Sequence, residues 1–283
     1  MTQFYSGIDI GSTMTKVVIA DNEGAITTSV ISATGPEHRK LANRVMEEAL
    51  SSAGLRLDDI AFIIATGYGR INVPFADKQV TEISCHAKGV HTQIPGARTV
   101  IDVGGQDCKG IKLNSKGRIM DFVMNDKCAA GAGRFLELMA DTLGIKLEEI
   151  GKLSLTAKNE AVISSTCTVF AEQEVITRLA EGVPMADLVA GIHRSIAVRI
   201  VGLVNRIKIE HEVVLTGGGA KNIGLVKALE TKLGMTVKIP PEPLLTGALG
   251  AAILAKEAVQ EAAEKGITLP FNRQPLQEAK FFE

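Results

Sequence analysis

Two segments of the chain repeat one residue pattern at a constant distance. Each begins with an apolar run that ends in Asp-x-Gly, continues as a second β-branched run, turns at a glycine and returns as a third extended run. Six pairs of residues match at the same offset of 93 positions: Ile8 and Ile101, Asp9 and Asp102, Gly11 and Gly104, Lys16 and Lys109, Val18 and Ile111, and Gly24 and Gly117. Six matches at one offset indicate a duplicated strand-turn-strand unit. Such a chain is constrained to fold as two similar halves.

Helical periodicity follows each copy of the repeat. We expect helices over 36–52, 81–91, 134–143, 185–209 and 247–263, and a further strand over 212–216. Strands that alternate with helices predict an α/β protein with two similar domains. The expected division is a first domain over 1–96 completed by the helix 247–265, a second domain over 97–246, and a tail over 266–283.

Composition excludes several classes of function. The 31 Lys and Arg balance 32 Asp and Glu to a net charge of −1, and aromatic residues make up 4%. Both the positive field and the stacking surface that nucleic acids require are therefore missing. Apolar runs fall short of the ~20 residues needed to span a bilayer, and the first ten residues have no basic n-region of a signal peptide. We expect a cytoplasmic protein with reduced cysteines and no membrane partner.

The repeated acidic turns are suited to binding phosphate. The first repeat turns at Gly11-Ser12-Thr13 and the second at Gly104-Gly105-Gln106. Glycine lets backbone N–H groups approach an anion closely, hydroxyl groups add donors, and the carboxylates of Asp9 and Asp102 can hold a hydrated Mg²⁺. A third glycine segment, Gly217-Gly218-Gly219, opens a helix and suits a flat base and ribose. Taken singly, each segment is equally compatible with an ordinary tight turn.

The order of these motifs resembles the actin/Hsp70/sugar-kinase ATPase superfamily. The resemblance implies that the Asp9 turn is the first phosphate loop, the Asp102 turn the second, 215–219 the adenosine segment and 247–252 the second connecting helix. It also implies two duplicated ribonuclease-H-like domains of the actin-like ATPase fold, with Mg-ATP or ADP in the cleft between them. Lys16 and Lys109 match between the repeats, but a lysine on a strand is equally suited to face solvent.

Two of the four cysteines share a local setting. Cys128 and Cys167 each come directly before a predicted helix, where free N–H groups and the helix dipole favour a thiolate. No Cys-x-x-Cys pair occurs, which disfavours a zinc ribbon or a thioredoxin-type site. A cubane cluster needs four thiolates, so two ligands per chain require a two-fold dimer. The alternatives are two buried, inert thiols, or four ligands from one chain that include Cys85 and Cys108.

Five segments bring the resemblance closer: 65–70, 76–87, 124–134, 164–172 and 190–195. They resemble the activator ATPases of 2-hydroxyacyl-CoA dehydratases, a family that includes the ATPase subunits of benzoyl-CoA reductase. This resemblance implies a homodimer, or a heterodimer with a paralogous subunit. It also implies one bridging [4Fe–4S] cluster held by Cys128 and Cys167 of each subunit. The implied electron donor is ferredoxin or flavodoxin, and the acceptor is a dehydratase or reductase component.

Residue roles follow from the same resemblance. Asp9 and Asp102 would hold Mg²⁺, Ser12 and Thr13 would take phosphate, and Gln106 would orient the attacking water. Two other functions remain open at this point. A sugar or carboxylate kinase would use the same ATP site and bury its cysteines, and a regulatory ATPase would hydrolyse ATP without passing an electron.

Overall fold

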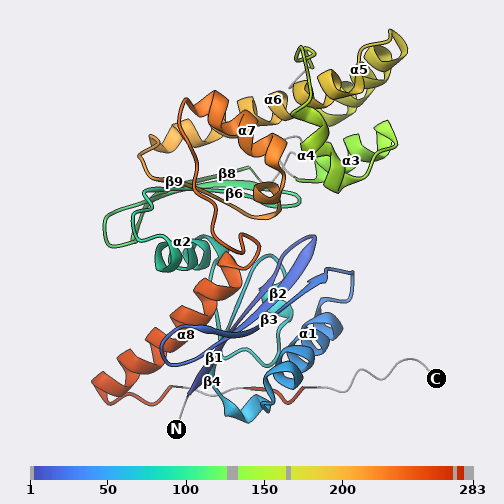
Figure 1. Ribbon diagram of the computed structural model, residues 1–283. Helices are drawn as coiled ribbons and strands as arrows, with labels where there is room; N and C mark the ends of the chain where they lie inside the picture. Colours follow the sequence, from blue (N-terminus) through green and yellow to red (C-terminus); the bar gives the residue numbers. More distant parts are fainter. Residues whose placement is uncertain (1–2, 126–132, 164–166, 270–272, 277–283) are drawn as a thin grey trace, which may run out of the picture. The chain divides into compact units, whose positions relative to one another are not determined.

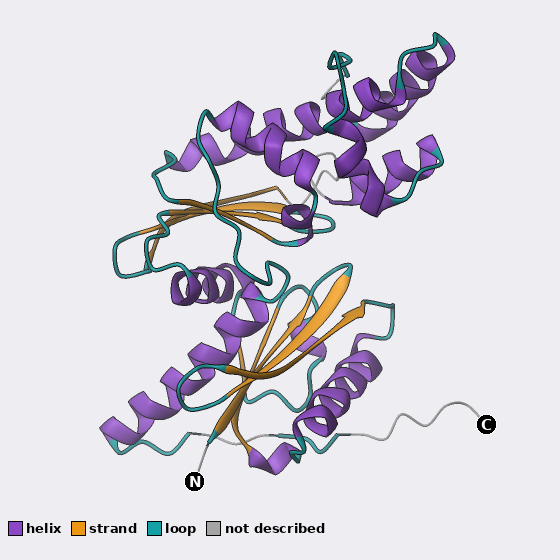
Figure 2. Ribbon diagram, in the orientation of Figure 1, coloured by secondary structure: helices purple, strands orange, loops and turns teal. Residues whose placement is uncertain are grey.

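The structure is a computed structural model that describes residues 3–125, 133–163, 167–269 and 273–276. The chain divides into two compact units, each with its own sheet and core (Figures 1 and 2). Unit 1 comprises Met1–Pro95 together with Leu244–Glu283, and unit 2 comprises Gly96–Pro243. Within the described residues, no helix combines the length and apolar character needed to cross a membrane.

The sheet of unit 1 has the strand order β3-β2-β1-β4-β5. Strand β2 is antiparallel to β1 and β3, whereas β4 runs parallel to β1 and β5 runs parallel to β4. The strands are β1 (Phe4–Ile10), β2 (Met14–Ala20), β3 (Ile26–Ala33), β4 (Ile60–Thr66) and β5 (Lys78–Gln79). The helices are α1 (His38–Ala53), α2 (Glu82–Gln93) and α8 (Thr246–Lys265).

Helices cover both faces of this sheet, as the period of two along its strands requires. On β2, Val17 packs on one face in a cluster with Val45 of α1. The next residue, Val18, packs on the opposite face in a cluster with Leu249 of α8. Figure 1 shows α1 and α8 on the two sides of these strands. The C-terminal helix therefore completes the core of the N-terminal sheet.

Unit 2 repeats this arrangement. Its sheet has the order β8-β7-β6-β9, and an isolated parallel bridge joins Val214 of β9 to Lys238 where unit 1 has β5. The strands are β6 (Thr99–Val103), β7 (Cys108–Leu113), β8 (Ile119–Asn125) and β9 (Val213–Thr216). The helices are α3 (Gly133–Leu143), α4 (Leu147–Ser154), α5 (Thr168–Ala180), α6 (Met185–Val204) and α7 (Ile223–Leu233). The matching strand orders confirm the predicted duplicated α/β fold.

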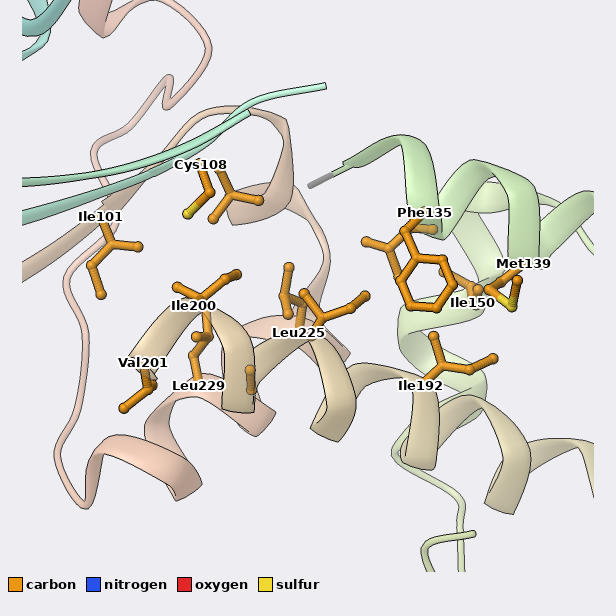
Figure 3. Packing of buried hydrophobic residues seen from close by; sticks show 14 of the residues in the cluster. Ile101, Cys108, Phe135, Met139, Ile150, Ile192, Ile200, Val201, Leu225 and Leu229 are labelled. Carbon is orange, nitrogen blue, oxygen red and sulfur yellow. The ribbon is translucent and has the colours of Figure 1, made fainter. Parts of the chain in front are cut away.

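The core of unit 2 joins one face of its sheet to five helices, α3 to α7. Figure 3 shows Cys108 of β7 near Ile200 of α6 and Leu225 of α7, with Phe135 of α3 further along the same cluster. The predicted helix 185–209 is wrong at its end, because α6 stops at Val204. A 3₁₀ turn follows, and then Lys208 adopts a φ of 56°, which no α-helix accommodates.

Candidate functional site

The two acidic turns have the same backbone geometry. The N–H of Gly11 donates to the carbonyl oxygen of Met14 at 3.1 Å, and the N–H of Gly104 donates to that of Asp107 at 3.0 Å. Each bond closes a tight turn between two antiparallel strands. The predicted anion-binding residues Ser12, Thr13, Gly104 and Gly105 are partly exposed in these turns, and Gln106 is exposed.

A carboxylate–lysine pair accompanies each turn. Asp9 lies directly across from Lys16 in the β1–β2 ladder, and Asp102 lies across from Lys109 in the β6–β7 ladder. The Lys16 Nζ is 3.0 Å from Asp9 Oδ2, and the Lys109 Nζ is 3.2 Å from Asp102 Oδ2 and 2.6 Å from Asp107 Oδ2. The Lys109 side chain is only 3% exposed. Of the two alternatives open for these lysines, the solvent-facing one is excluded, because each lysine pairs with a buried carboxylate.

A glycine in the left-handed region stands beside each carboxylate. Gly67 follows β4 with a φ of 82°, and Gly217 follows β9 with a φ of 80°. A Cβ on Gly67 would clash with Asp9 Oδ1, and a Cβ on Gly217 would lie 2.7 Å from Asp102 Oδ1. Only glycine suits either position. Sequence reasoning found Gly217 but missed Gly67, whose role depends on the long-range pairing of β4 with β1.

The third glycine segment is anchored to the following loop. Gly217 N–H donates to the carbonyl oxygen of Pro243 at 3.0 Å, and a 3₁₀ turn runs over Gly218–Lys221. Gly217 and Gly219 are buried, whereas Gly218 is exposed. A Cβ on Gly219 would press against the side chain of Val103. Gly218 is therefore the accessible residue of this glycine segment.

Helix α3 begins on the second acidic turn. The N–H of Gly133 donates to the carbonyl oxygen of Gly104 at 2.8 Å, and the N–H of Arg134 donates to that of Gly105 at 2.7 Å. These bonds satisfy two of the donors that a helix leaves unpaired at its start. Cys128, a predicted cluster ligand, lies outside the described residues, in the segment that leads into this helix. The second acidic turn thus contacts the first turn of α3.

Cys167, the other predicted ligand, is the N-cap residue of α5. The nearby backbone N–H groups of Val169 and Phe170 lower the pKa of its thiol below the ordinary value. Glu172, one turn into the same helix, accepts a hydrogen bond from Thr142 Oγ1 of α3 at 3.2 Å. Helix α3 therefore contacts the Cys167-bearing helix as well as the second acidic turn.

The remaining cysteines have a different environment. Burial raises the pKa of Cys85 to about 12, and burial likewise raises that of Cys108, which lies in the core of unit 2. Neither favours a thiolate. Among the residues that the structure describes, no group of three or more His, Cys, Asp or Glu side chains is placed to hold a metal ion.

Comparisons with known proteins identify the family and the fold of the chain. Residues 6–255 match the model of the BadF/BadG/BcrA/BcrD ATPase family. The chain is 47% identical over 264 residues to a 2-hydroxyisocaproyl-CoA dehydratase activator from Clostridioides difficile, covering 92% of this chain and 97% of the relative. It is 34% identical over 277 residues to a benzoyl-CoA reductase subunit from Thauera aromatica, covering 92% and 98%.

A solved structure of a close relative carries a nucleotide. The activator of the 2-hydroxyisocaproyl-CoA dehydratase from Clostridium difficile with bound ADPNP superposes with a TM-score of 0.87 and 45% identity. The match covers 94% of this chain and 98% of that one. Together with the duplicated sheets and turns, these matches establish the actin-like ATPase fold and show that the chain belongs to the BadF/BadG/BcrA/BcrD ATPase family.

Proposed function

We propose that this protein hydrolyses ATP to deliver a low-potential electron to a partner 2-hydroxyacyl-CoA dehydratase. The observation that carries the proposal is the set of bonds around α3. Its first two N–H groups bind the carbonyls of Gly104 and Gly105, and its Thr142 binds Glu172 of the helix capped by Cys167. The turn to which we assign phosphate binding and the helix that begins at the Cys167 thiol thus both contact α3. The name of the relative that is 47% identical supports the choice of partner.

Asp9 and Asp102 are suited to hold Mg²⁺ through its water shell. Each carboxylate already receives a lysine ammonium, so direct coordination would compete with that ion pair. Mg²⁺ releases its water reluctantly and is commonly held by one or two carboxylates plus phosphate oxygens. Asp9 and Asp102 would hold the hydrated ion, which would neutralise phosphate charge when bound, and Lys16 and Lys109 balance the charge of the two carboxylates.

The turns supply the phosphate-binding groups. Gly11, Ser12 and Thr13 present N–H and hydroxyl donors in the first turn, and Gly104 and Gly105 present N–H groups in the second. Gln106 is exposed at the second turn, where its amide can orient the attacking water. The accessible edge at Gly218, flanked by Gly217 and Gly219, is assigned to adenosine. Placement of the nucleotide between the two domains stays a prediction.

The donor set fits an iron–sulfur cluster in part. Cys167 provides a thiol whose pKa is lowered by the nearby backbone N–H groups of its helix, a setting that favours sulfur ligation. Cys85 and Cys108 are buried thiols with raised pKa values, so we exclude them as ligands. Cys128 and Cys167 of two subunits would hold a [4Fe–4S] cluster, which supplies one-electron storage at low potential when bound.

The outer face of α5 supports a dimer. Val169 is 60% exposed, Phe170 is 68% exposed, and Ile176 lies two helical turns beyond Val169 on the same face and is also exposed. Exposed apolar residues gathered on one helix mark an interaction surface. Because this surface adjoins Cys167, we propose that a second subunit covers it and brings its own thiols to the cluster. That subunit is a second copy or a paralogue.

The proposed electron donor is ferredoxin or flavodoxin. A second candidate acceptor is a benzoyl-CoA-type reductase, which the 34% identity to the Thauera aromatica protein favours. The dehydratase remains the first choice because the identity to its activator is higher, at 47%.

The test is reconstitution of an oxidised, inactive 2-hydroxyacyl-CoA dehydratase with this protein, MgATP and a low-potential reductant under anaerobic conditions. Wild type should start dehydration only when ATP is present. Asp9→Ala should lose ATP turnover and activation but keep the brown colour. Cys167→Ser should lose the colour and activation, whereas the matched control Cys108→Ala should keep both.

Three results would refute the proposal. Activation without ATP would show that the nucleotide is not required. Full activation by Cys167→Ser would show that Cys167 is not a cluster ligand. ATP-dependent phosphorylation of a sugar or carboxylate by iron-free protein would instead identify a kinase.

A further inference from the structure

Helices α2 and α8 of unit 1 pack backbone against backbone. A Cβ on Gly89 of α2 would clash with the carbonyl oxygen of Thr246, and a Cβ on Gly250 of α8 would clash with that of Cys85. Glycine at both positions is required because no side chain fits between the helices. The start of α8 is therefore fixed against the middle of α2.

The same first turn of α8 lies against β1. A Cβ on Gly7 would clash with the carbonyl oxygen of Ala248. Asp9 lies two residues beyond Gly7 on the same face of β1. Its carboxylate reaches the first turn of α8. A Cβ on Gly247 would lie 3.0 Å from Asp9 Oδ2 and 3.2 Å from His86 Nε2. Asp9 and His86 thus approach the same point of α8 from β1 and α2.

His86 is fixed in this position by a buried hydrogen bond. Its Nδ1 lies 2.9 Å from Thr246 Oγ1, the hydroxyl of the first residue of α8. Both side chains are buried. A buried polar pair of this kind costs free energy if either partner is lost, so it fixes the ring orientation. The proposed ATPase mechanism so far gives His86 no role.

We propose that His86 is a positioning residue for ATP hydrolysis. Through Thr246 it holds the first turn of α8 beside Asp9, so that the Asp9 carboxylate keeps the position in which it would hold hydrated Mg²⁺. The positive end of the α8 dipole at this turn also favours the carboxylate charge. This inference rests on the proposed ATPase function. Loss of the His86–Thr246 bond lets the turn and the carboxylate shift together.

Substitutions of His86 separate positioning from simple packing. The amide of an asparagine reaches the place of the histidine Nδ1, whereas the amide of a glutamine reaches that of Nε2. Because Nδ1 makes the bond, His86→Asn should keep kcat within about threefold of wild type. His86→Gln and His86→Leu should lower kcat about 10- to 100-fold, as expected for a reacting group displaced by about 1 Å.

Nucleotide binding provides a second readout. The Kd for MgADP, measured by calorimetry, should stay within about threefold in every His86 variant, because positioning affects turnover more than binding. The kcat of Thr246→Val should match that of His86→Leu, and the kcat of Thr246→Ser should match that of wild type. The double variant His86→Leu/Thr246→Val should be no slower than either single variant. The control is His91→Leu on the same helix, which should keep the wild-type kcat.

Wild-type kcat in His86→Leu would overturn the inference, and so would rescue by glutamine rather than asparagine. A parallel loss of kcat, MgADP affinity and melting temperature would also overturn it, because that pattern indicates a structural role. If the wild-type protein itself hydrolyses no ATP, the proposed function fails and the inference falls with it. An active wild type with an unaffected His86→Leu variant refutes the inference alone.

Discussion

In the C-terminal tail, Arg273 binds a buried carboxylate of unit 1. The Arg273 guanidinium contacts both carboxylate oxygens of Asp77, with Nη2 at 2.6 Å from Oδ2, and Nη1 donates to the carbonyl oxygens of Leu57 and Ile60. The Asp77 side chain is 0% exposed and also accepts the N–H of Ile63. Arg273→Met would leave this carboxylate buried without its cation.

The magnitude follows from the burial of the pair. Removing one partner of a buried ion pair costs about 3–5 kcal/mol, because the other charge stays desolvated. At roughly 3 °C per kcal/mol for a unit of this size, the melting temperature of unit 1 should fall by about 10 °C. Adding Asp77→Asn to Arg273→Met should recover much of the loss, because the uncompensated charge is gone.

Tyrosine fluorescence can follow this unit alone. The chain has two tyrosines and no tryptophan, and both Tyr5 and Tyr68 belong to unit 1. Thermal unfolding of wild type, Arg273→Met and the double variant should therefore report the stability of unit 1 directly. Arg56→Met is the matched control, because Arg56 is 84% exposed in its pair with Asp59, and an exposed pair contributes about 0–1 kcal/mol.

A melting temperature for Arg273→Met within about 2 °C of the Arg56→Met control would refute this reasoning. So would a double variant that is less stable than Arg273→Met. Either result would mean that the tail pair adds nothing beyond a surface contact.

The other predictions concern a buried imidazole, a glycine and a lysine. Burial lowers the pKa of His193 to about 4 from 6.5, so the unfolded chain gains a proton first as the pH falls. Stability should drop by about 3 kcal/mol between pH 6.5 and 4. His193→Leu should flatten that part of the curve in urea titrations, and an unchanged slope would contradict the assignment. Gly67→Ala places a Cβ against the Asp9 carboxylate at a φ of 82°, and should cut kcat for ATP about 100-fold; wild-type turnover would exclude the tight fit. Lys109→Met should destabilise unit 2 by about 3–5 kcal/mol in urea unfolding, because Asp102 stays buried. A loss below about 1 kcal/mol would show that the pair is effectively solvated.

Local sequence was enough to predict the duplicated fold. The matched Asp9 and Asp102 turns indicated two strand-turn-strand units because hairpin geometry is set by neighbouring residues. The end of α6 could not be predicted in this way. Its apolar periodicity continues past Val204. The left-handed backbone conformation at Lys208 occurs without the glycine that usually indicates such a position in a sequence. Helix α4 was missed because its eight residues are too few for a clear period.

The site was harder to predict where it depends on contacts distant in sequence. The burial of Lys109 follows from the face of the sheet on which β7 places it, which a single strand does not reveal. Gly67 acquires its role only through the parallel pairing of β4 with β1. His86 acquires its role only through the packing of α2 on α8. The place of Cys167 at the start of α5 was predictable because an N-cap position is a local property.

The iron content of anaerobically purified protein tests the central claim most directly, because it decides whether two chains share one cluster. Native mass spectrometry and iron analysis of the same sample should give a dimer with about four iron atoms, and Cys167→Ser should give about none. Eight iron atoms per dimer, or a monomer with four, would contradict the account, because one chain would then supply every ligand.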